Sequence, residues 1–196
     1  MRVIPTDIQD LYILEPEIFG DRRGWFFESW SQRKMEEAGI TVRFVQDNHS
    51  YSARKGTLRG LHLQKGEAAQ AKLVRCVRGA VYDVAVDLRE GSPTYRKWAG
   101  VELSAENYRQ LFIPRGFAHG FLTLRNDTEF LYKADNFYTP EAEAGIRWDD
   151  PELAVDWGEA RPILNAKDSA APFLRDCDFH FPYPSGACMP DDPPVQ

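Results

Sequence analysis

The chain has 196 residues and a mass of 22.4 kDa, which is enough for one domain with a sizeable core plus a short tail. Hydrophobic residues make up 43% and aromatic residues 13%, which excludes an intrinsically disordered chain. The net charge of −6 and the pI near 5.3 argue against binding to the phosphate backbone of nucleic acid.

No apolar run approaches membrane-spanning length, and the N-terminus lacks the apolar core of a signal peptide. The three cysteines, Cys76, Cys177 and Cys188, show no metal-ligand spacing, and Cys76 lies in an apolar run typical of a buried thiol. We therefore expect a reduced, cytoplasmic protein that binds neither a membrane nor nucleic acid.

Most predicted elements are short strands. In chain order they cover residues 11–14, 25–28, 42–49, 57–64, 72–77, 80–88, 96–103, 110–114, 118–124 and 129–137. The one clear helix of the first half can be capped by Ser31 and ended by Gly39. Many short strands with little helix indicate an antiparallel sandwich or barrel, and we expect a jelly roll whose mouth opens onto a ligand cavity.

Two polar segments of the first third have open interpretations. Arg22 and Arg23, in a loop bounded by Gly20 and Gly24, form either a turn that presents positive charge or a solvated turn. The strand predicted over 42–49 ends in four polar side chains, which suits either a pocket wall or a hydrogen-bonded turn.

The end of the chain differs in composition from the rest. Residues 176–196 contain five prolines, which is typical of an extended or disordered tail. We therefore expect one domain over residues 1–175 and a tail over 176–196 that lies outside the core.

The strand over 57–64 carries an arginine and a histidine close together, an unusual pair for packing alone. Strict alternation would place Arg59 on the opposite face from His62. Gly60 could bring them together by a bulge, since glycine within a strand often marks one. The alternative is that Arg59 forms a surface ion pair.

A lysine in the next strand is expected to point inward. Lys72 alternates with Val74 and Cys76, and a buried lysine is costly unless it is paired. Asp83, on the strand that follows the turn at Gly79, is a candidate partner. Tyr132 lies in another strand, where a core tyrosine is the commoner role on composition alone.

A second histidine raises the question of a metal. Pro114-x-Gly116-x-x-His119 is a metal-binding signature of cupin barrels, but such sites normally have His-x-His where this chain has His62 and Gln64. Two imidazoles without a third histidine or a well-placed carboxylate make a poor transition-metal site, so we expect no metal.

Several longer motifs, in order along the chain, resemble one family. They are Arg59-Gly60-Leu61-His62, Lys72-Leu73-Val74-Arg75, Asp83-Val84-Ala85-Val86-Asp87, Leu103-Ser104-Ala105-Glu106-Asn107, Ile113 to Phe121 and Glu129-Phe130-Leu131-Tyr132-Lys133. They are similar to those of the dTDP-4-dehydrorhamnose 3,5-epimerases, over about residues 11–173. The resemblance implies an all-β, cupin-type antiparallel jelly-roll barrel that is metal-free and usually a homodimer, with a few short helices.

The resemblance also implies a reaction and a set of site residues. The enzyme would be an isomerase that inverts C3 and C5 of dTDP-4-dehydro-6-deoxy-D-glucose, without a cofactor. His62 would be the base, Asp168 its orienting partner, Tyr132 the acid on the opposite sugar face, and Lys72 the residue that steadies the enolate. The nucleotide-sugar site would be lined by Phe19, Arg23, Glu28, Gln46, Asn48, Arg59 and His119, with Glu143 and Lys167 at further ligand-contacting positions.

Three other functions compete with this interpretation. A single-carbon epimerase would keep the fold and invert only C3 or only C5 of a dTDP-4-keto-deoxysugar. A sugar-nucleotide binding module without turnover would not need His62, Lys72, Tyr132 and Asp168 together. A metal-dependent cupin oxygenase would contain stoichiometric metal.

Overall fold

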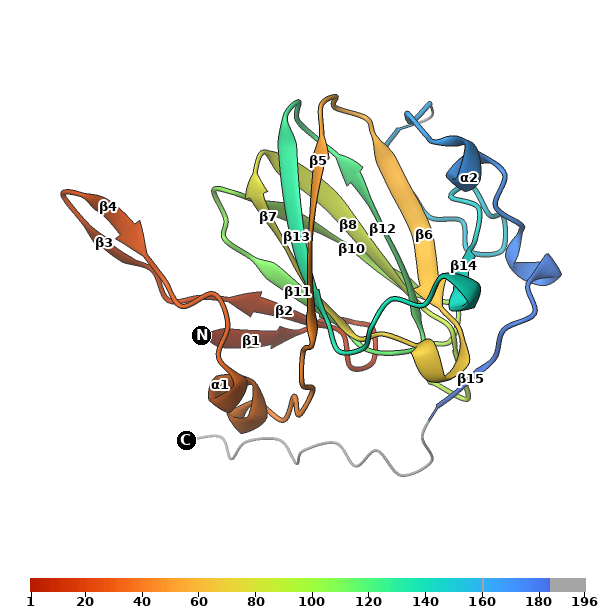
Figure 1. The fold of residues 1–196 in the computed structure, drawn as a ribbon, viewed down its shortest axis with the longest axis horizontal. Coiled ribbons are helices and arrows are strands. Elements are labelled where there is room, and N and C mark those ends of the chain that lie inside the picture. Colours follow the sequence, from red (N-terminus) through yellow and green to blue (C-terminus); the bar gives the residue numbers. More distant parts are fainter. Residues whose placement is uncertain (160, 184–196) are drawn as a thin grey trace.

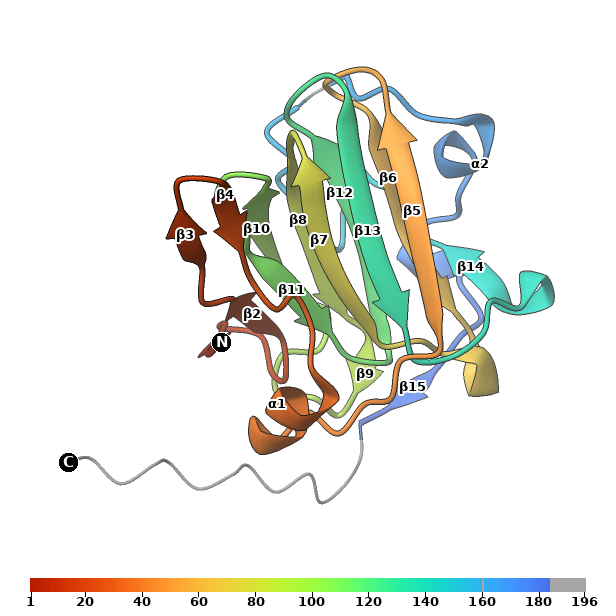
Figure 2. The ribbon, with the colours of Figure 1, turned by 60° about the vertical axis from the view of Figure 1, so that its left-hand side comes forward.

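The computed structural model describes residues 1–159 and 161–183, and in it two antiparallel sheets lie face to face (Figures 1 and 2). The six-stranded sheet comprises, in spatial order, β1 (Arg2–Pro5), β2 (Tyr12–Glu15), β11 (Gln110–Ile113), β7 (Lys72–Arg78), β13 (Thr128–Ala134) and β5 (Gln46–Ser52). The five-stranded sheet comprises β10 (Trp98–Ser104), β8 (Ala80–Asp87), β12 (Phe117–Thr123), β6 (Leu58–Gln64) and β14 (Glu143–Gly145). The all-β jelly-roll prediction is therefore confirmed.

The remaining elements are small. Two strand pairs lie outside the main sheets: β3 (Phe19–Asp21) with β4 (Gly24–Phe26), and β9 (Arg89–Glu90) with β15 (Phe181–Pro182). The helices are α1 (Gln32–Glu37), α2 (Ala166–Ser169) and the 3-10 turns η1 (Gly66–Ala68), η2 (Pro140–Ala142) and η3 (Leu174–Asp176). In the described part of the chain, no helix has the length and apolar character needed to cross a membrane.

Strand alternation divides the apolar residues among three layers. One set fills the space between the sheets, where Phe121 and Phe130 stack with ring centroids 4.2 Å apart. A second set covers the outer face of the five-stranded sheet beneath the C-terminal segments, and includes Trp157. The third lies on the outer face of the six-stranded sheet, where Met35 of α1 is buried. Because β8 and β12 are covered on both faces, they are almost wholly buried.

Two predicted elements differ in detail from the structure. The strand expected over 42–49 begins only at Gln46, so its polar residues alternate along β5 instead of ending a strand. The turn at Arg22 and Arg23 joins β3 to β4 in a hairpin that projects from the sheets (Figure 1). The helix after Ser31 is confirmed, although the Ser31 side chain forms no cap hydrogen bond.

The turn at Gly79 joins two sheets, whereas a tight turn usually joins paired strands. Strand β7 pairs with β11 and β13, while β8 pairs with β10 and β12. Gly79 has φ +75°, and a Cβ there would lie 2.5 Å from the Thr128 hydroxyl, so only glycine fits this corner. As a result, inward residues of β7 and β8 face each other across the interior.

The first residues of the expected tail pack onto the domain. Phe181 is buried and pairs with Arg89, and Tyr183 donates its backbone N–H to Glu90 O. The apolar Phe181 side chain explains this difference from the predicted tail, because it joins the core beneath the five-stranded sheet. The rest of the expected tail lies outside the described residues, and the division at residue 175 stays a prediction.

Candidate functional site

A bulge in β6 places Arg59 and His62 on the same face. The partner strand β12 aligns His119 with His62 but Phe121 with Arg59, so β6 contains one extra residue between them. Gly60, with φ +127°, lies in this bulge, and a Cβ there would lie 2.6 Å from the Gly120 Cα. Both side chains therefore point into the space between the sheets, as expected from a bulge at Gly60.

His62 is held by a carboxylate from a distant part of the chain. Its Nε2–H donates to Asp168 Oδ1 at 2.6 Å, and the Gly60 N–H donates to Asp168 Oδ2 at 3.3 Å. The His62 side chain is 32% exposed and that of Asp168 only 2%, so the imidazole is accessible while its partner is buried. Burial would raise the pKa of Asp168, but the hydrogen bonds from His62 and Gly60 keep it below its ordinary value.

Local structure explains how Asp168 reaches this position. Asn165 caps α2 by accepting the Asp168 N–H at 2.7 Å, which fixes the short helix. Upstream, Ile163 bridges Thr57, and its carbonyl accepts the Leu58 N–H at 2.9 Å. The segment that carries Asp168 is thereby fastened beside β6.

Lys72 and Tyr132 approach from the opposite sheet. They lie on β7 and β13, and the Lys72 Nζ is 5.7 Å from the centre of the Tyr132 ring. Burial lowers the pKa of Lys72 to about 8, and burial raises the pKa of Tyr132. The phenol is therefore protonated at neutral pH and can donate a proton, while the ammonium can stabilise a nearby negative charge.

Asp83 bonds to His119 instead of forming the ion pair with Lys72 that the sequence suggested. The His119 Nε2 lies 2.9 Å and 3.1 Å from the two Asp83 oxygens, and both side chains are buried. Among the described residues Lys72 has no ion-pair partner. The negative charge of Asp83 nevertheless opposes the lowering of the Lys72 pKa by burial. The separation follows from the sheet change at Gly79, which places Lys72 and Asp83 on opposite walls.

Arg59 and a group of amides line the edge of the sheets at β5 and β6. Arg59 Nε donates to Ser52 Oγ at 3.2 Å and its Nη2 donates to Tyr51 O at 3.0 Å, so the guanidinium spans from one sheet to the other. Gln46 Nε2 donates to Asn48 Oδ1 at 3.1 Å, while the Asn48 Nδ2 is buried without a partner among the described residues. That amide is free to bind a ligand.

A third group of charges lies beside the dyad that His62 and Asp168 form. Lys167 forms an ion pair with Glu143, whose Oε2 also accepts the Tyr138 hydroxyl at 3.0 Å. Burial would raise the pKa of Glu143, but the bonds from Lys167 and Tyr138 lower it. A cavity of about 460 Å³ opens here and is lined by His62, Glu143, Lys167, Asp168 and residues of the 170–179 segment. It is large enough for a sugar.

Three of the predicted site residues lie elsewhere. Phe19 and Arg23 belong to the β3–β4 hairpin, on the opposite side of the molecule from α2 in Figure 1. Of the residues that the structure describes, Arg23 bonds only to Asp21 within the same hairpin, and Glu28 pairs with Lys34. Within one chain these three side chains do not reach the dyad.

Sequence reasoning missed Tyr138. Its backbone N–H donates to Gln46 Oε1 at 3.0 Å and its hydroxyl donates to Glu143, so it bridges two predicted site residues. Its position just before Thr139-Pro140, in a turn that follows β13, was the available signal. The Thr139 N–H in turn donates to the buried Gln64 Oε1 at 2.8 Å.

Gln64 therefore has a structural role at the position where a metal cupin has its second histidine. Among the described residues, no group of three or more His, Cys, Asp or Glu side chains is arranged to hold a metal ion. The buried thiol predicted at Cys76 is confirmed, and burial raises its pKa to about 11.

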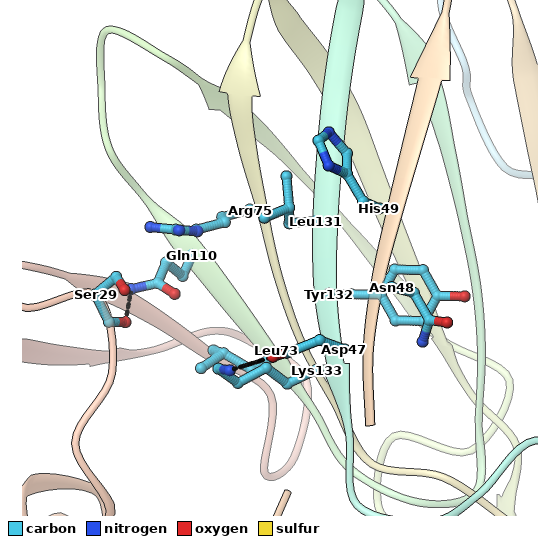
Figure 3. Close-up of a pocket in the computed structure, with 10 residues that line it drawn as sticks. All are labelled: Ser29, Asp47, Asn48, His49, Leu73, Arg75, Gln110, Leu131, Tyr132 and Lys133. Carbon is cyan, nitrogen blue, oxygen red and sulfur yellow. Dashed lines mark hydrogen bonds and ion pairs between the residues drawn. The ribbon is translucent and has the colours of Figure 1, made fainter. Parts of the chain in front are cut away.

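A second groove lies on the outer face of the six-stranded sheet (Figure 3). Gln110 donates to Ser29 O at 2.7 Å across it, and Lys133 pairs with Asp47 at 2.8 Å. In this view Tyr132 points away from Arg75, towards the interior. Asn48 and Tyr132 of the site are also among the residues that line this groove, so the groove adjoins the site through β5 and β13.

The comparisons with known proteins agree with this geometry. The family profile described as dTDP-4-dehydrorhamnose 3,5-epimerase matches residues 5–176. The Salmonella typhimurium dTDP-4-dehydrorhamnose 3,5-epimerase is 58% identical over 176 residues, covering 89% of this chain and 96% of that protein.

Solved structures give the same result. The Legionella pneumophila dTDP-6-deoxy-D-glucose-3,5-epimerase, in complex with dTDP-4-keto-L-rhamnose, superposes with a TM-score of 0.89 at 48% identity, covering 94% of this chain and 99% of the other. A 3'-monoepimerase from Streptomyces bikiniensis, in complex with dTDP-quinovose, is 33% identical with a TM-score of 0.81, covering 87% of each chain. The chain therefore belongs to the dTDP-4-dehydrorhamnose 3,5-epimerase family.

Proposed function

We propose that this protein is an isomerase that inverts C3 and C5 of dTDP-4-dehydro-6-deoxy-D-glucose to give dTDP-4-dehydro-L-rhamnose. Both carbons flank the C4 ketone, so a proton can leave either one to form an enolate. No redox step is involved, so the reaction requires no electron-accepting cofactor.

One observation carries the proposal: a base and an acid face each other from opposite sheets. His62 lies on β6 of one sheet, and Tyr132 lies on β13 of the other. Inversion requires a proton to leave one face of the sugar and another to arrive on the opposite face. A site with a single acid–base residue would return the proton to the same face.

The roles of the four central residues follow from their surroundings. His62 Nε2–H is bonded to Asp168, which leaves Nδ1 to accept the substrate proton and lets the carboxylate stabilise the imidazolium. Protonated Tyr132 donates to the opposite face. The Lys72 ammonium stabilises the enolate oxygen, an electrostatic contribution that is often the largest in such reactions.

The nucleotide part would bind at the edge residues. Arg59 and Lys167 supply positive charge for the diphosphate, since arginine can grip phosphate oxygens in pairs. Asn48, with its unpartnered Nδ2, and Gln46 supply amide groups, and Glu143 holds Lys167 in place.

Relatives favour inversion at both carbons over inversion at one. The 3,5-epimerases reach 58% identity, whereas a dTDP-4-dehydrorhamnose 3-epimerase from Streptomyces niveus is 39% identical and the 3'-monoepimerase 33% identical. A double mutant of that monoepimerase alters a histidine and a tyrosine separated in sequence by the same number of residues as His62 and Tyr132. This supports a shared acid–base pair.

The test is proton exchange followed by NMR in deuterated water with the dTDP-4-keto sugar. We expect deuterium at both C3 and C5 with the wild type, and none with His62→Ala, whose circular dichroism should be unchanged. His180→Ala is the matched control, because His180 is exposed and pairs with Glu90 away from the site. Unchanged exchange in His62→Ala would contradict the proposal, and exchange at a single carbon would indicate the single-carbon epimerase.

We further propose that the active form is a cytoplasmic homodimer in which the β3–β4 hairpin of one copy completes the site of the other. The hairpin exposes Phe19, Trp25 and Phe26, at 56%, 59% and 69%, an unusual cost for a monomer. The family resemblance places Phe19, Arg23 and Glu28 at the site, which they do not reach within one chain.

Mixing two inactive variants tests this arrangement. Arg23→Ala and His62→Ala are each expected to be nearly inactive, but a mixed dimer has one intact site formed by both chains. After exchange of subunits about a quarter of all sites should be intact, as the statistics of a two-fold dimer require. Recovery of activity on mixing, with light scattering at the dimer mass, supports the proposal, and no recovery from exchanged dimers contradicts it.

A further inference from the structure

The barrel interior contains a buried carboxylate that the proposed reaction does not use directly. The Asp83 side chain has no exposed surface, and among the described residues its hydrogen bonds go to a single group, the His119 Nε2. Burying a carboxylate costs several kcal/mol unless nearby charge and hydrogen bonds compensate. One N–H shared between two oxygens compensates only in part, so Asp83 requires another explanation.

His119 does not neutralise this carboxylate. Burial lowers the pKa of His119 against the opposing effect of Asp83, and the nearby Lys72 and His62 side chains lower it further. The imidazole is therefore neutral at neutral pH, and its single N–H is donated to Asp83. The pair as a whole keeps one negative charge inside the barrel.

Lys72 is the positive charge that faces this pair. It lies on β7, across the interior from Asp83 on β8, and the charge of Asp83 is the first of two that raise its pKa against burial. The other interior titratable groups around it lie on four further strands: His119 on β12, His62 and Arg59 on β6, Tyr132 on β13 and Glu143 on β14.

The separation of Lys72 from Asp83 matters for chemistry. A carboxylate in direct contact would occupy the ammonium N–H groups that must bind the enolate oxygen. His119 holds Asp83 on the opposite wall, so its charge favours the protonated lysine while the N–H groups stay available. A neutral amine in the same place would lose the electrostatic stabilisation of the enolate.

We propose that Asp83, held by His119, is a positioning residue that keeps Lys72 protonated and directed at the substrate C4 oxygen. The proposal rests on the proposed function in one respect, the use of that ammonium by the reaction. It also changes the expected role of His119, which would act through Asp83 instead of contacting the nucleotide sugar.

Direct titration of Lys72 tests the proposal without turnover. Protein labelled with ¹³C at the lysine Cε is titrated by NMR, and the Lys72 signal is the one lost in Lys72→Met. We expect Lys72 to titrate near pH 8 in the wild type and about one pH unit lower in Asp83→Asn, as loss of a nearby opposite charge predicts. The same midpoint in both proteins would overturn the proposal, whether or not the wild type exchanges substrate protons.

Asp87→Asn is the matched control, since Asp87 is equally buried on the same strand but bonds to Arg89. It should leave the Lys72 midpoint unchanged. A lower midpoint of the same size in Asp87→Asn would show an unspecific effect and overturn the proposal.

Two His119 variants keep the test decisive if Asp83→Asn does not fold. His119→Phe removes the N–H donor that holds Asp83 on its wall, so the Lys72 midpoint should move away from the wild-type value. His119→Gln retains an N–H donor and should titrate close to wild type. Equal midpoints in the two variants would contradict the proposal.

Kinetics supply an independent measurement. In the wild type, kcat should fall as the pH rises through the Lys72 pKa near 8, because the ammonium is then lost. In Asp83→Asn this alkaline fall should begin at lower pH. A reduction in kcat by the same factor at every pH would indicate a purely structural role and overturn the proposal.

Discussion

Two buried aspartates four residues apart on β8 have very different surroundings. Asp87 accepts hydrogen bonds from Arg89, Ser92 and Thr94, and Arg89 also pairs with Asp10. In the described part of the chain, the Asp83 side chain accepts only the His119 N–H, and it faces Lys72 across the interior.

The difference separates a structural cluster from a functional one. Around Asp87, each carboxylate oxygen accepts at least two hydrogen bonds, so little capacity is left for a ligand. Around Asp83 and the neighbouring dyad, Lys72 Nζ and Asn48 Nδ2 have no hydrogen-bond partner among the described residues. Buried groups with unfilled bonding capacity are costly for stability, and they concentrate where a substrate will complete the bonding.

The largest expected effect is a loss of activity when the dyad near Asp83 is altered. Asp168→Asn should lower kcat by about 10³–10⁴-fold, similar to loss of the orienting carboxylate in a His–Asp pair of a serine-protease triad. The amide can offer an N–H to His62 and so favour the wrong tautomer, and it cannot stabilise the imidazolium. Steady-state kinetics at pH 7 measure the loss.

Unfolding of the same variant by urea should stay close to wild type, because α2 is a short surface element fixed by Asn165. A variant that retains more than a tenth of wild-type kcat would show that the carboxylate does not act on His62.

The largest effect on stability should come from the other cluster. Asp87→Asn leaves Arg89 as a buried charge with one partner fewer, and breaking such a pair costs about 3–5 kcal/mol of unfolding free energy. Urea unfolding at pH 7 measures it. The kcat of the folded variant should remain near wild type, and a selective loss of kcat without loss of stability would reverse the distinction between the clusters.

A smaller effect should appear in the pH dependence of stability. Burial would raise the pKa of Asp87, but hydrogen bonds from Arg89, Ser92 and Thr94 lower it below its ordinary value. A lowered folded-state pKa stabilises the protein above the unfolded pKa of about 4, and this stability is lost as the pH falls through the folded value. The difference in unfolding free energy between wild type and Asp87→Asn should therefore shrink below pH 4, and a constant difference would contradict the assignment.

Strand alternation predicted much of this site from the sequence. It placed Lys72 inside the barrel. The presence of Gly60 within a strand indicated the bulge that brings Arg59 beside His62. These features depend on residues within one strand, so local patterns contain them.

The rest depends on contacts that local patterns do not contain. Asp168 reaches His62 only because Asn165 caps a four-residue helix and Ile163 bridges to β6. The pairing of Asp83 with His119 follows from the change of sheet at Gly79, which the sequence presents as an ordinary turn. Family resemblance identified Asp168 where spacing alone could not.

The smallest expected effect concerns the segment that closes the structural cluster from outside. The Arg89 guanidinium lies between the Phe117 and Tyr183 rings, 4.7 Å and 4.9 Å from their centres. Tyr183→Ala should lower the unfolding free energy by about 1 kcal/mol, which combines a cation–π contact with some lost packing. For a chain of this size that corresponds to a fall in Tm of about 2–4 °C by calorimetry.

Tyr183→Phe is the matched control for this change, because it keeps the ring over Arg89 and removes only the hydroxyl. Its Tm should stay near wild type, and both variants should keep wild-type kcat because Tyr183 lies at the Arg89 cluster and not at the dyad. If Tyr183→Ala lowered kcat at constant Tm, the C-terminal segment would belong to the functional cluster around Asp83 and the dyad. A fall in Tm alone would place it with Asp87 and Arg89, where each buried charge already has its partners.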